Sequence, residues 1–310
     1  MRAAGIEHYG DSVRPMTIPE PRRLEPDELL LQVRTAGVAN WDDIARTGGW
    51  ELGITPPMAL GVEAAGTVLA VGSSVQRAGV GDAIITHPVP LRDQGTWAEQ
   101  VIVAEDTVAR KPAWMTWPEA GAFPVPGLTA YQTLVSVLHV ERGEWLLVHG
   151  ASGVTGSIIV TVAAELGARV IATAGPDATR RMLDAGAMHV VDYHHPDWPH
   201  TVRGLTAQQG VAAAANAVPG QASVALQTVH PGGRLATITG DPPPERDGIT
   251  VSDVYVRADG EQLQRVTTLL EQRQTRIRIA GIYGLEHAAQ ALSAVVESRL
   301  RGAAVLEPQR

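Results

Sequence analysis

Short apolar segments alternate with longer amphipathic ones in the second half of the chain. The apolar segments start 20 to 24 residues apart and lie at Trp145–His149, Arg169–Thr173, His189–Val191, Val211–Ala215 and Arg234–Ile238. Between the first two, an apolar residue recurs at every fourth position from Val154 to Leu166, and Gly167 follows where a helix would end. This alternation predicts a parallel sheet whose strands are connected by helices.

The first 110 residues have a different pattern. Their short apolar stretches are bounded by glycine and proline, and examples are Leu29–Val33, Thr67–Val71, Ala83–Thr86 and Val101–Val103. Stretches of this length, interrupted this often by turn residues, predict a small antiparallel β domain.

Prolines mark the expected junction between these two regions, at Pro112, Pro118, Pro124 and Pro126. Each ring restricts φ and removes a backbone donor, which favours a boundary over a continuous element. Beyond Val256 the chain becomes more polar, and Glu261–Gln272 and Leu285–Glu297 have helical spacing. We predict one domain of residues 1–117 with 262–310 and a second of residues 118–261.

Composition narrows the function classes. The 310 residues carry a net charge of -8 and contain no clustered basic patch, which argues against a nucleic-acid partner. Cysteine is absent, so thiolate catalysis and sulfur-ligated zinc are excluded. The N-terminus has no apolar leader and no apolar run is long enough to cross a membrane, so we expect a cytoplasmic protein without a membrane partner.

A glycine-rich loop follows the first strand of the repeating pattern and leads into the predicted helix. Its residues are Gly150, Ala151, Ser152, Gly153, Val154, Thr155 and Gly156. Glycines at this spacing allow a tight turn, a close approach of backbone amides to a pyrophosphate, and close packing of helix on strand. Strand, loop, helix and second strand occur in the order that a dinucleotide site needs, so we predict dinucleotide binding here.

The end of the second strand bears on the choice of dinucleotide. It reads Ala172, Thr173, Ala174 and Gly175, with no carboxylate to accept a hydrogen bond from a ribose 2′-hydroxyl. Arg180 and Arg181 follow, and a guanidinium can bind a 2′-phosphate with two hydrogen bonds. This arrangement favours NADPH; the alternative is that both arginines are simply solvated.

Two other groups of side chains are candidate sites. His194, His195 and His200 lie close together in sequence, but no carboxylates complete a metal site, so we expect a solvated loop and no bound metal. The serine of the glycine loop lacks the final glycine of a hydrolase nucleophile turn, which argues against a hydrolase.

At this point the chain resembles the zinc-free quinone oxidoreductase branch, which includes ζ-crystallin-like proteins, of the medium-chain dehydrogenase/reductase superfamily. The segments that carry the resemblance are 37–43, 46–48, 61–66, 81–82, 127–131, 231–235 and 285–291, together with the glycine loop. The resemblance implies an α/β protein with a Rossmann doubly wound parallel sheet domain plus a GroES-like β-barrel catalytic domain. Val62 stands where zinc enzymes of the superfamily have histidine, which disfavours zinc-type alcohol oxidation.

The resemblance also implies roles for individual residues. It places Thr129 and Tyr131 near the nicotinamide and Tyr193 near the adenosine phosphate, and the expected cofactor-binding residues further include Asn216 and Gly240. The candidate substrate pocket comprises Asn40, Trp41, Trp50, Trp97 and Tyr131, with core packing as the alternative for each aromatic residue. Asp42, Asp43 and Glu63 are interpreted as structural, and no residue is assigned a catalytic role.

The leading functional hypothesis is an NADPH-dependent, metal-free reductase that transfers hydride to a quinone or an α,β-unsaturated carbonyl compound. The alternatives are an enoyl-thioester or biosynthetic ene reductase of the same branch, and a non-catalytic NADPH-binding structural or regulatory protein. The expected partner molecule is small, planar and apolar. The β-prone run Ile249–Val256 follows the last sheet strand, and together with the resemblance it predicts a homodimer formed through this edge.

Overall fold

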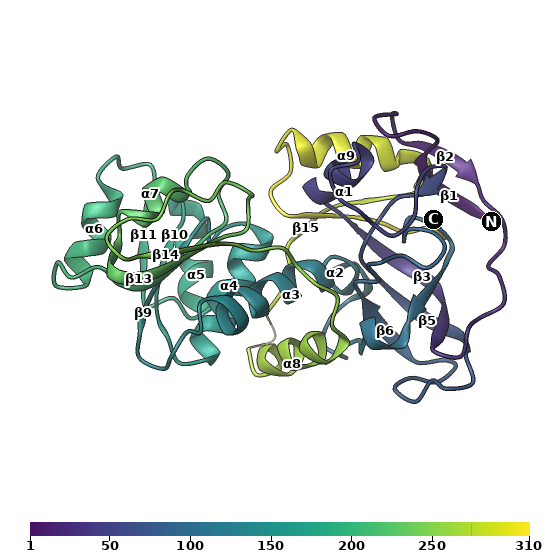
Figure 1. The fold of residues 1–310 in the computed structure, drawn as a ribbon, viewed down its shortest axis with the longest axis horizontal. Coiled ribbons are helices and arrows are strands. Elements are labelled where there is room, and N and C mark those ends of the chain that lie inside the picture. Colours follow the sequence, from purple (N-terminus) through teal and green to yellow (C-terminus); the bar gives the residue numbers. More distant parts are fainter. Residues whose placement is uncertain (274) are drawn as a thin grey trace. The chain divides into compact units, whose positions relative to one another are not determined.

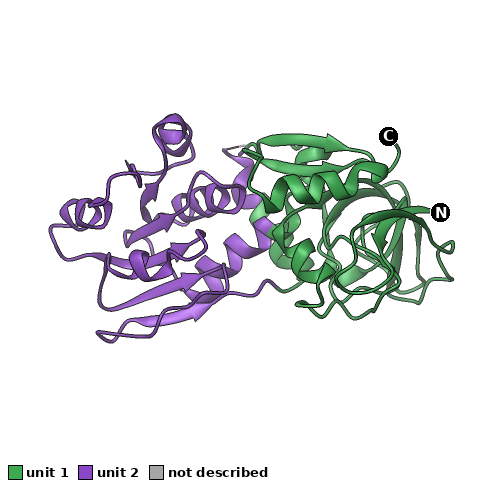
Figure 2. Cartoon of the chain, turned by 90° about the horizontal axis from the view of Figure 1, so that it is seen from above, with its two compact units in different colours: residues 1–125, 257–267, 276–310 green, residues 126–256, 268–275 purple. Residues whose placement is uncertain are grey.

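The chain folds into two compact units in a computed structural model that describes residues 1–273 and 275–310. Unit 1 comprises Met1–Val125, Arg257–Thr267 and Arg276–Arg310, and unit 2 comprises Pro126–Val256 and Thr268–Thr275 (Figure 2). These units differ at their borders from the predicted domains, since residues 118–125 and 257–261 group with unit 1 and residues 268–275 with unit 2. The chain first passes between units within helix α3 (Pro124–Tyr131), in the proline-rich stretch.

Unit 2 contains a parallel sheet flanked by helices (Figure 1). Its strands are β9 (Trp145–His149), β10 (Arg169–Thr173), β11 (His189–Val191), β12 (Val211–Asn216), β13 (Val229–Thr237) and β14 (Thr250–Asp253). Their order across the sheet is β11-β10-β9-β12-β13-β14. The first three strands therefore run outward in one direction and the next three in the other, which is the doubly wound arrangement that binds dinucleotides at the reversal point.

The helices of unit 2 connect these strands. They are the end of α3 with its π-helical continuation Gln132–Val137, then α4 (Val154–Glu165), α5 (Thr179–Asp184), α6 (Trp198–Leu205) and α7 (Ala222–Leu226). The fourfold apolar repeat predicted α4 correctly, and Gly167 behind it has the positive φ of 87° that a helix end requires. Strand residues such as Leu147, Ile171 and Ala214 are fully buried, so the core of the unit lies on the sheet.

Strand β14 forms one edge of this sheet. It pairs with β13 alone, in parallel register from Arg234 opposite Thr250 to Thr237 opposite Asp253. Two residues beyond its end, Tyr255 is 76% exposed. The β-prone run at residues 249–256 is thus an edge strand followed by an exposed aromatic side chain.

Unit 1 is built mainly from antiparallel strands, as the glycine- and proline-punctuated pattern predicted. Its strands are β1 (Arg2–Ile6), β2 (Arg14–Thr17), β3 (Glu28–Val38), β4 (Met58–Ala59), β5 (Ala64–Val71), β6 (Ala83–Thr86), β7 (Gln100–Ala104), β8 (Val108–Arg110), β15 (Ile279–Tyr283) and β16 (Ala303–Leu306). A small sheet has the order β2-β1-β4, and a larger one has the order β15-β16-β3-β5-β6-β8 with β7 also pairing with β3. The helices of this unit are α1 (Asn40–Arg46), α2 (Trp117–Gly121), α8 (Gly260–Glu271, which ends in unit 2) and α9 (Ala288–Val296).

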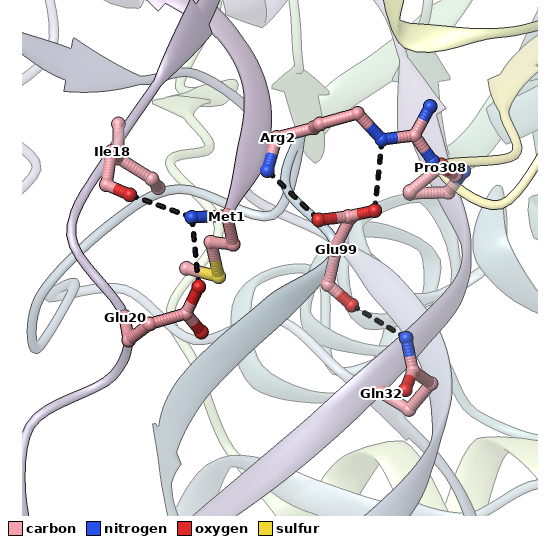
Figure 3. A network of polar contacts seen from close by, with 7 residues as sticks. All are labelled: Met1, Arg2, Ile18, Glu20, Gln32, Glu99 and Pro308. Carbon is pink, nitrogen blue, oxygen red and sulfur yellow. Dashed lines mark hydrogen bonds and ion pairs between the residues drawn. The ribbon is translucent and has the colours of Figure 1, made fainter.

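Polar contacts tie the first strand of unit 1 to segments far away in sequence (Figure 3). Glu99 accepts hydrogen bonds from the backbone nitrogen of Arg2 at 2.8 Å and from its Nε at 2.9 Å. The same guanidinium donates to the carbonyl oxygen of Pro308 at 2.9 Å, and Gln32 of β3 donates to the carbonyl oxygen of Glu99 at 3.1 Å. The pair formed by Arg2 and Glu99 therefore connects strand β1 to strand β3 and to the segment around residue 308.

No helix in residues 1–273 or 275–310 combines the length and apolar character needed to cross a membrane.

Candidate functional site

The turn between β9 and α4 depends on glycine at two positions. Gly150 has a φ of +84°, and a Cβ there would lie 2.6 Å from Cγ2 of Val218. A Cβ on Gly156 would lie 2.2 Å from the carbonyl oxygen of Gly150, so the first turn of α4 packs directly on the loop. At Gly153 the nearest neighbour of such a Cβ is 3.5 Å away, which leaves room for a ligand to approach.

The N-terminus of α4 presents backbone amides without a competing side chain. Gly153 is the N-cap, and no side chain caps the helix in the described part of the chain. By helix geometry the amides of Val154, Thr155 and Gly156 have no acceptor within the helix. These donors and the positive end of the helix dipole suit an anion, so the loop fits the pyrophosphate of a dinucleotide.

Thr173 supports this loop from the neighbouring strand. Its side chain is fully buried, and its Oγ1 accepts from the amide of Gly150 at 3.1 Å and lies 2.7 Å from Nδ1 of His149. Burial lowers the pKa of His149 to about 4, so the ring is neutral and its Nδ1 can accept the threonine proton. Thr173 was predicted to bind the cofactor. In the structure its hydroxyl is hydrogen-bonded to the amide of Gly150 and to His149, so it holds the glycine loop in position.

The end of β10 differs from the expectation drawn from the sequence. The amide of Ala174 donates to Val191 across the sheet, and Gly175 follows. A Cβ on Gly175 would lie 3.2 Å from Oδ1 of Asp177 and 3.2 Å from Cε1 of His194. A carboxylate is therefore present at this edge although the strand itself carries none, because the chain turns back immediately after the strand.

The two predicted arginines have different surroundings. Nη2 of Arg181 donates to the carbonyl oxygen of Ser152 at 2.8 Å, which places a guanidinium beside the glycine loop. Arg180 is 87% exposed in its side chain and pairs with Asp184 at 3.0 Å on its own helix. The structure thus brings Arg181, and not Arg180, against the loop.

Tyr193 and His194 lie together in the segment after β11. Tyr193 is 43% exposed, and its ring centroid is 4.2 Å from that of His194. Nδ1 of His194 lies 2.6 Å from Oδ1 of Asp192. The imidazole reaches Gly175, so residues of this segment border the end of β10. The sequence pattern had indicated only a solvated loop at His194.

Asn216 is buried at the carboxyl end of β12. Its Nδ2 donates to the carbonyl oxygen of Val218 at 3.1 Å and to Oγ1 of Thr237 at 3.1 Å, and its Oδ1 accepts from the amide of Val218. The side chain therefore shapes the loop after β12. Gly240, in the neighbouring loop, has a φ of +71° and no described atom within 4 Å of a Cβ placed there, so its surroundings are open.

The predicted residues on α3, Thr129 and Tyr131, are buried, at 8% and 9% exposure.

The predicted substrate wall in unit 1 runs along and beyond α1. Asn40 is exposed at the first position of the helix, and Trp41 is partly buried. Trp50 is also partly buried, and its ring centroid is 5.9 Å from that of the buried His87. Trp50 therefore keeps an accessible portion while one edge packs on a neutral imidazole, whose pKa burial lowers to about 4.

The prediction for Trp97 is wrong. This side chain is fully buried, and its Nε1 donates to the carbonyl oxygen of Gly37 at 2.8 Å. A tryptophan whose ring is enclosed and whose single donor is satisfied by the backbone is part of the core. It offers no surface to a substrate.

Burial shifts the pKa of two acids of unit 1. Burial raises the pKa of Asp42 to about 8 and that of Glu63 well above its usual range. Asp42 accepts from the amide of Ala39 at 2.8 Å, and Glu63 accepts from the amide of Val125 at 2.9 Å. Both carboxyls therefore satisfy backbone donors, in agreement with their structural interpretation.

The side chains do not fit a zinc ion. The sequence has no cysteine, and the described residues contain no group of three or more histidine, aspartate or glutamate side chains placed to hold a metal. Val62 supplies no side-chain ligand where zinc enzymes of the superfamily have histidine, and its carbonyl oxygen is bonded to Nδ1 of His87 at 2.7 Å.

Two family models match the chain. The alcohol dehydrogenase GroES-like domain matches residues 25–113, and the zinc-binding dehydrogenase family matches residues 185–306.

Individual proteins are similar over different spans. A mycocerosic acid synthase-like polyketide synthase of Mycobacterium tuberculosis is 32% identical over 69% of this chain. The match covers only 10% of the length of that much longer protein. The quinone oxidoreductase of Sus scrofa is 27% identical over 92% of this chain and 89% of its own length. A solved structure described as an NAD-dependent alcohol dehydrogenase has a TM-score of 0.87 at 27% identity and covers 99% of both chains.

Two glycine substitutions separate the structural role of the glycine loop from its proposed role in ligand binding. Gly156→Ala should lower the melting temperature, because its Cβ would meet the carbonyl oxygen of Gly150. Gly153→Val should leave the melting temperature nearly unchanged but weaken the binding of a nicotinamide dinucleotide, because its side chain fills the space a pyrophosphate would approach. Thermal unfolding and ligand titration of both variants measure this, and tight dinucleotide binding by Gly153→Val would contradict it.

Proposed function

We propose that this chain is an NADPH-dependent, metal-free reductase of quinones or activated alkenes. The proposal starts from its family, because the chain belongs to the quinone oxidoreductase branch of the medium-chain dehydrogenase/reductase superfamily. The observation that carries the proposal is the open cradle at the N-terminus of α4, with glycine at 150, 153 and 156. A bound reduced nicotinamide supplies the hydride, and water or a nearby hydroxyl supplies the proton that completes reduction of the acceptor. The chain's own residues bind, orient and shield the reactants.

The cofactor proposal weighs three side chains at one edge of the sheet. Arg181 beside Ser152 supplies positive charge next to the loop, which favours a 2′-phosphate. Asp177 beside Gly175 favours a 2′-hydroxyl and opposes the phosphate. The imidazole of His194 borders the same edge, with its Cε1 3.2 Å from the position that a Cβ would take on residue 175.

The acceptor proposal follows from the donor set of unit 1, whose described side chains form no metal-ligand group. Where no Lewis acid polarises the substrate, the favoured acceptors are those whose own electron-poor carbon or ring accepts hydride, such as quinones and α,β-unsaturated ketones. The polyketide synthase relative keeps enoyl thioesters in consideration as an alternative. A second alternative is a structural or regulatory protein that binds NADPH without turnover.

A single set of assays separates these functions. NADPH oxidation should be measured against naphthoquinones, enones and enoyl thioesters, and dissociation constants should be measured for NADPH and NADH. We expect turnover with at least one acceptor class and about tenfold tighter binding of NADPH, the scale of one charge-assisted contact. Equal constants would contradict the NADPH choice, and binding without any turnover would support the non-catalytic alternative.

Trp50 is proposed to stack on the planar acceptor. Trp50→Ala should raise KM for the acceptor by several-fold, since aromatic stacking contributes roughly 0.5–1.5 kcal/mol beyond buried area. The affinity for NADPH should stay the same, and Trp50→Phe should retain most of the acceptor affinity. Steady-state kinetics and ligand titration measure both quantities, and unchanged kinetics in Trp50→Ala would return this residue to the core.

We also propose that the edge strand β14 pairs with its counterpart in a second copy of the chain. Pairing by a two-fold axis would give each edge strand a second strand partner and cover Tyr255. Light scattering at micromolar concentration should give the mass of a dimer. Val251→Pro should give a monomer, because proline lacks the amide donor that bonds to Oε1 of Glu245 at 3.1 Å in the single chain and would turn to the second copy. A monomeric mass for the unchanged protein would contradict the proposal.

A further inference from the structure

Two loops follow neighbouring strands in the second half of the parallel sheet of unit 2. Residues 217–221 follow β12, and residues 238–241 follow β13. A doubly wound sheet consists of two mononucleotide-binding halves, and strands β9, β10 and β11 with the glycine loop form the first of them. The two loops therefore belong to the half that would take the nicotinamide nucleotide of a dinucleotide.

One carboxylate, that of Asp241, bonds to both loops. Its Oδ2 accepts a hydrogen bond from the backbone amide of Gly220 at 2.7 Å, which joins residues 21 positions apart in the sequence. Its Oδ1 accepts from Oγ1 of Thr237 at 2.9 Å and from Oγ1 of Thr239. Asp241 is thus a direct link between the loop after β12 and the end of β13 with the loop that follows it.

Asn216 determines the direction of the hydrogen bonds in this network. Its Nδ2 donates to Oγ1 of Thr237 at 3.1 Å and to Oγ1 of Thr239 at 3.3 Å. Because each threonine hydroxyl accepts from this amide group, its own hydrogen is directed to Asp241. Both oxygens of residue 241 must then be acceptors, which a carboxylate provides and a carboxamide does not.

The charge of Asp241 strengthens these hydrogen bonds. Burial raises its pKa, but the hydrogen bonds from the two threonines and from the amide of Gly220 outweigh burial and hold the pKa below its usual range. The group is therefore an ionised acceptor at neutral pH, and hydrogen bonds to a charged group are stronger than those between neutral groups.

Each loop has exposed backbone beside this anchor. Gly220 and Gly240 have φ values of +73° and +71°, and no described atom lies within 4 Å of a Cβ placed on either residue. Open space at a glycine allows a ligand to approach the backbone closely. The carboxylate of Asp241 bonds to the first of these glycines and directly follows the second in the chain.

We propose that Asp241 is a positioning residue that holds the two loops in one arrangement, so that their backbone meets the nicotinamide half of a bound dinucleotide. A preformed surface spares the ligand the free energy of ordering it, so the link between the loops strengthens binding of this half. This inference rests on the proposed dinucleotide binding and goes beyond it by naming a residue that acts through the loops.

Two kinds of ligand separate the halves of the site. ADP contains the adenosine and pyrophosphate that NADPH and NADH share, so it occupies the first half alone. In Asp241→Asn, the dissociation constant of whichever dinucleotide binds the unchanged protein more tightly should rise by about tenfold, the effect of losing one hydrogen bond to a charged group. The dissociation constant of ADP should stay nearly the same.

Hydrogen exchange of the protein without ligand measures the loops directly. In Asp241→Asn, the amide of Gly220 should exchange faster because its acceptor is lost, while the amides of β12 should keep their protection. Asp197→Asn provides the matched control, because it removes an exposed carboxylate of the same unit at the start of α6. This control should leave both dissociation constants and the exchange of Gly220 unchanged.

Melting temperatures establish that the variants are folded. If Asp241→Asn does not fold, Thr239→Val takes its place, because it removes one donor to the same carboxylate. Unchanged exchange at Gly220, or equal weakening of dinucleotide and ADP binding, would overturn this inference while leaving dinucleotide binding intact. Absence of binding of both dinucleotides to the unchanged protein would overturn the proposed function and this inference together.

Discussion

The contact between the first turn of α4 and the loop before it constrains the rest of the candidate site. The carbonyl oxygen of Gly150 occupies the place where a side chain on residue 156 would begin. Because helix and loop touch without side chains between them, the amides of the first turn lie directly beside the strand ends. The buried hydroxyl of Thr173 accepts a hydrogen bond from the amide of Gly150 and so holds the loop in place against strand β10. Everything proposed for cofactor binding depends on this close packing.

The same packing determines which neighbouring segments can reach the ligand. Strands β11, β10, β9 and β12 end in a row, with Thr173 opposite Val191 and Asn216 opposite His149. The side chains of His149, Thr173 and Asn216 are buried and hydrogen-bonded, so they build the edge and leave recognition to the segments beyond it. Asp177 and His194 come from the segments directly after β10 and β11, and Arg181 comes from helix α5.

Sequence periodicity predicted the architecture of unit 2 well and the chemistry at its edge less well. The strand from Trp145 to His149 and the helix after it were located because burial on one face imposes a regular spacing. Asp177 and His194 were missed because their approach to Gly175 results from two turns that meet in space, and no local pattern encodes such a meeting. The short strands β15 and β16 were missed because they lie outside the repeating strand–helix spacing that located strands as short as β11.

The aromatic residues of unit 1 show a second limit of the sequence. Trp50 and Trp97 have the same chemistry, and each lies within two residues of a glycine. Only the structure shows that Trp97 donates to the backbone of Gly37 inside the core while Trp50 stays partly accessible against His87. Burial of an aromatic ring is decided by the packing of distant strands, which single-sequence patterns do not contain.

The buried ionisable groups of unit 1 share one property that bears on the proposed chemistry. Burial penalises the charged form of each: it raises the pKa of Asp42 to about 8 and that of Glu63 well above its usual range, and it lowers the pKa of His87 to about 4. Two of them bond to backbone amides and the third to the carbonyl oxygen of Val62. These side chains are at most 2% exposed, so they supply no charged group to an acceptor. An acceptor that delocalises the charge over its own conjugated system, as a quinone or an enone does, needs the least help from such surroundings.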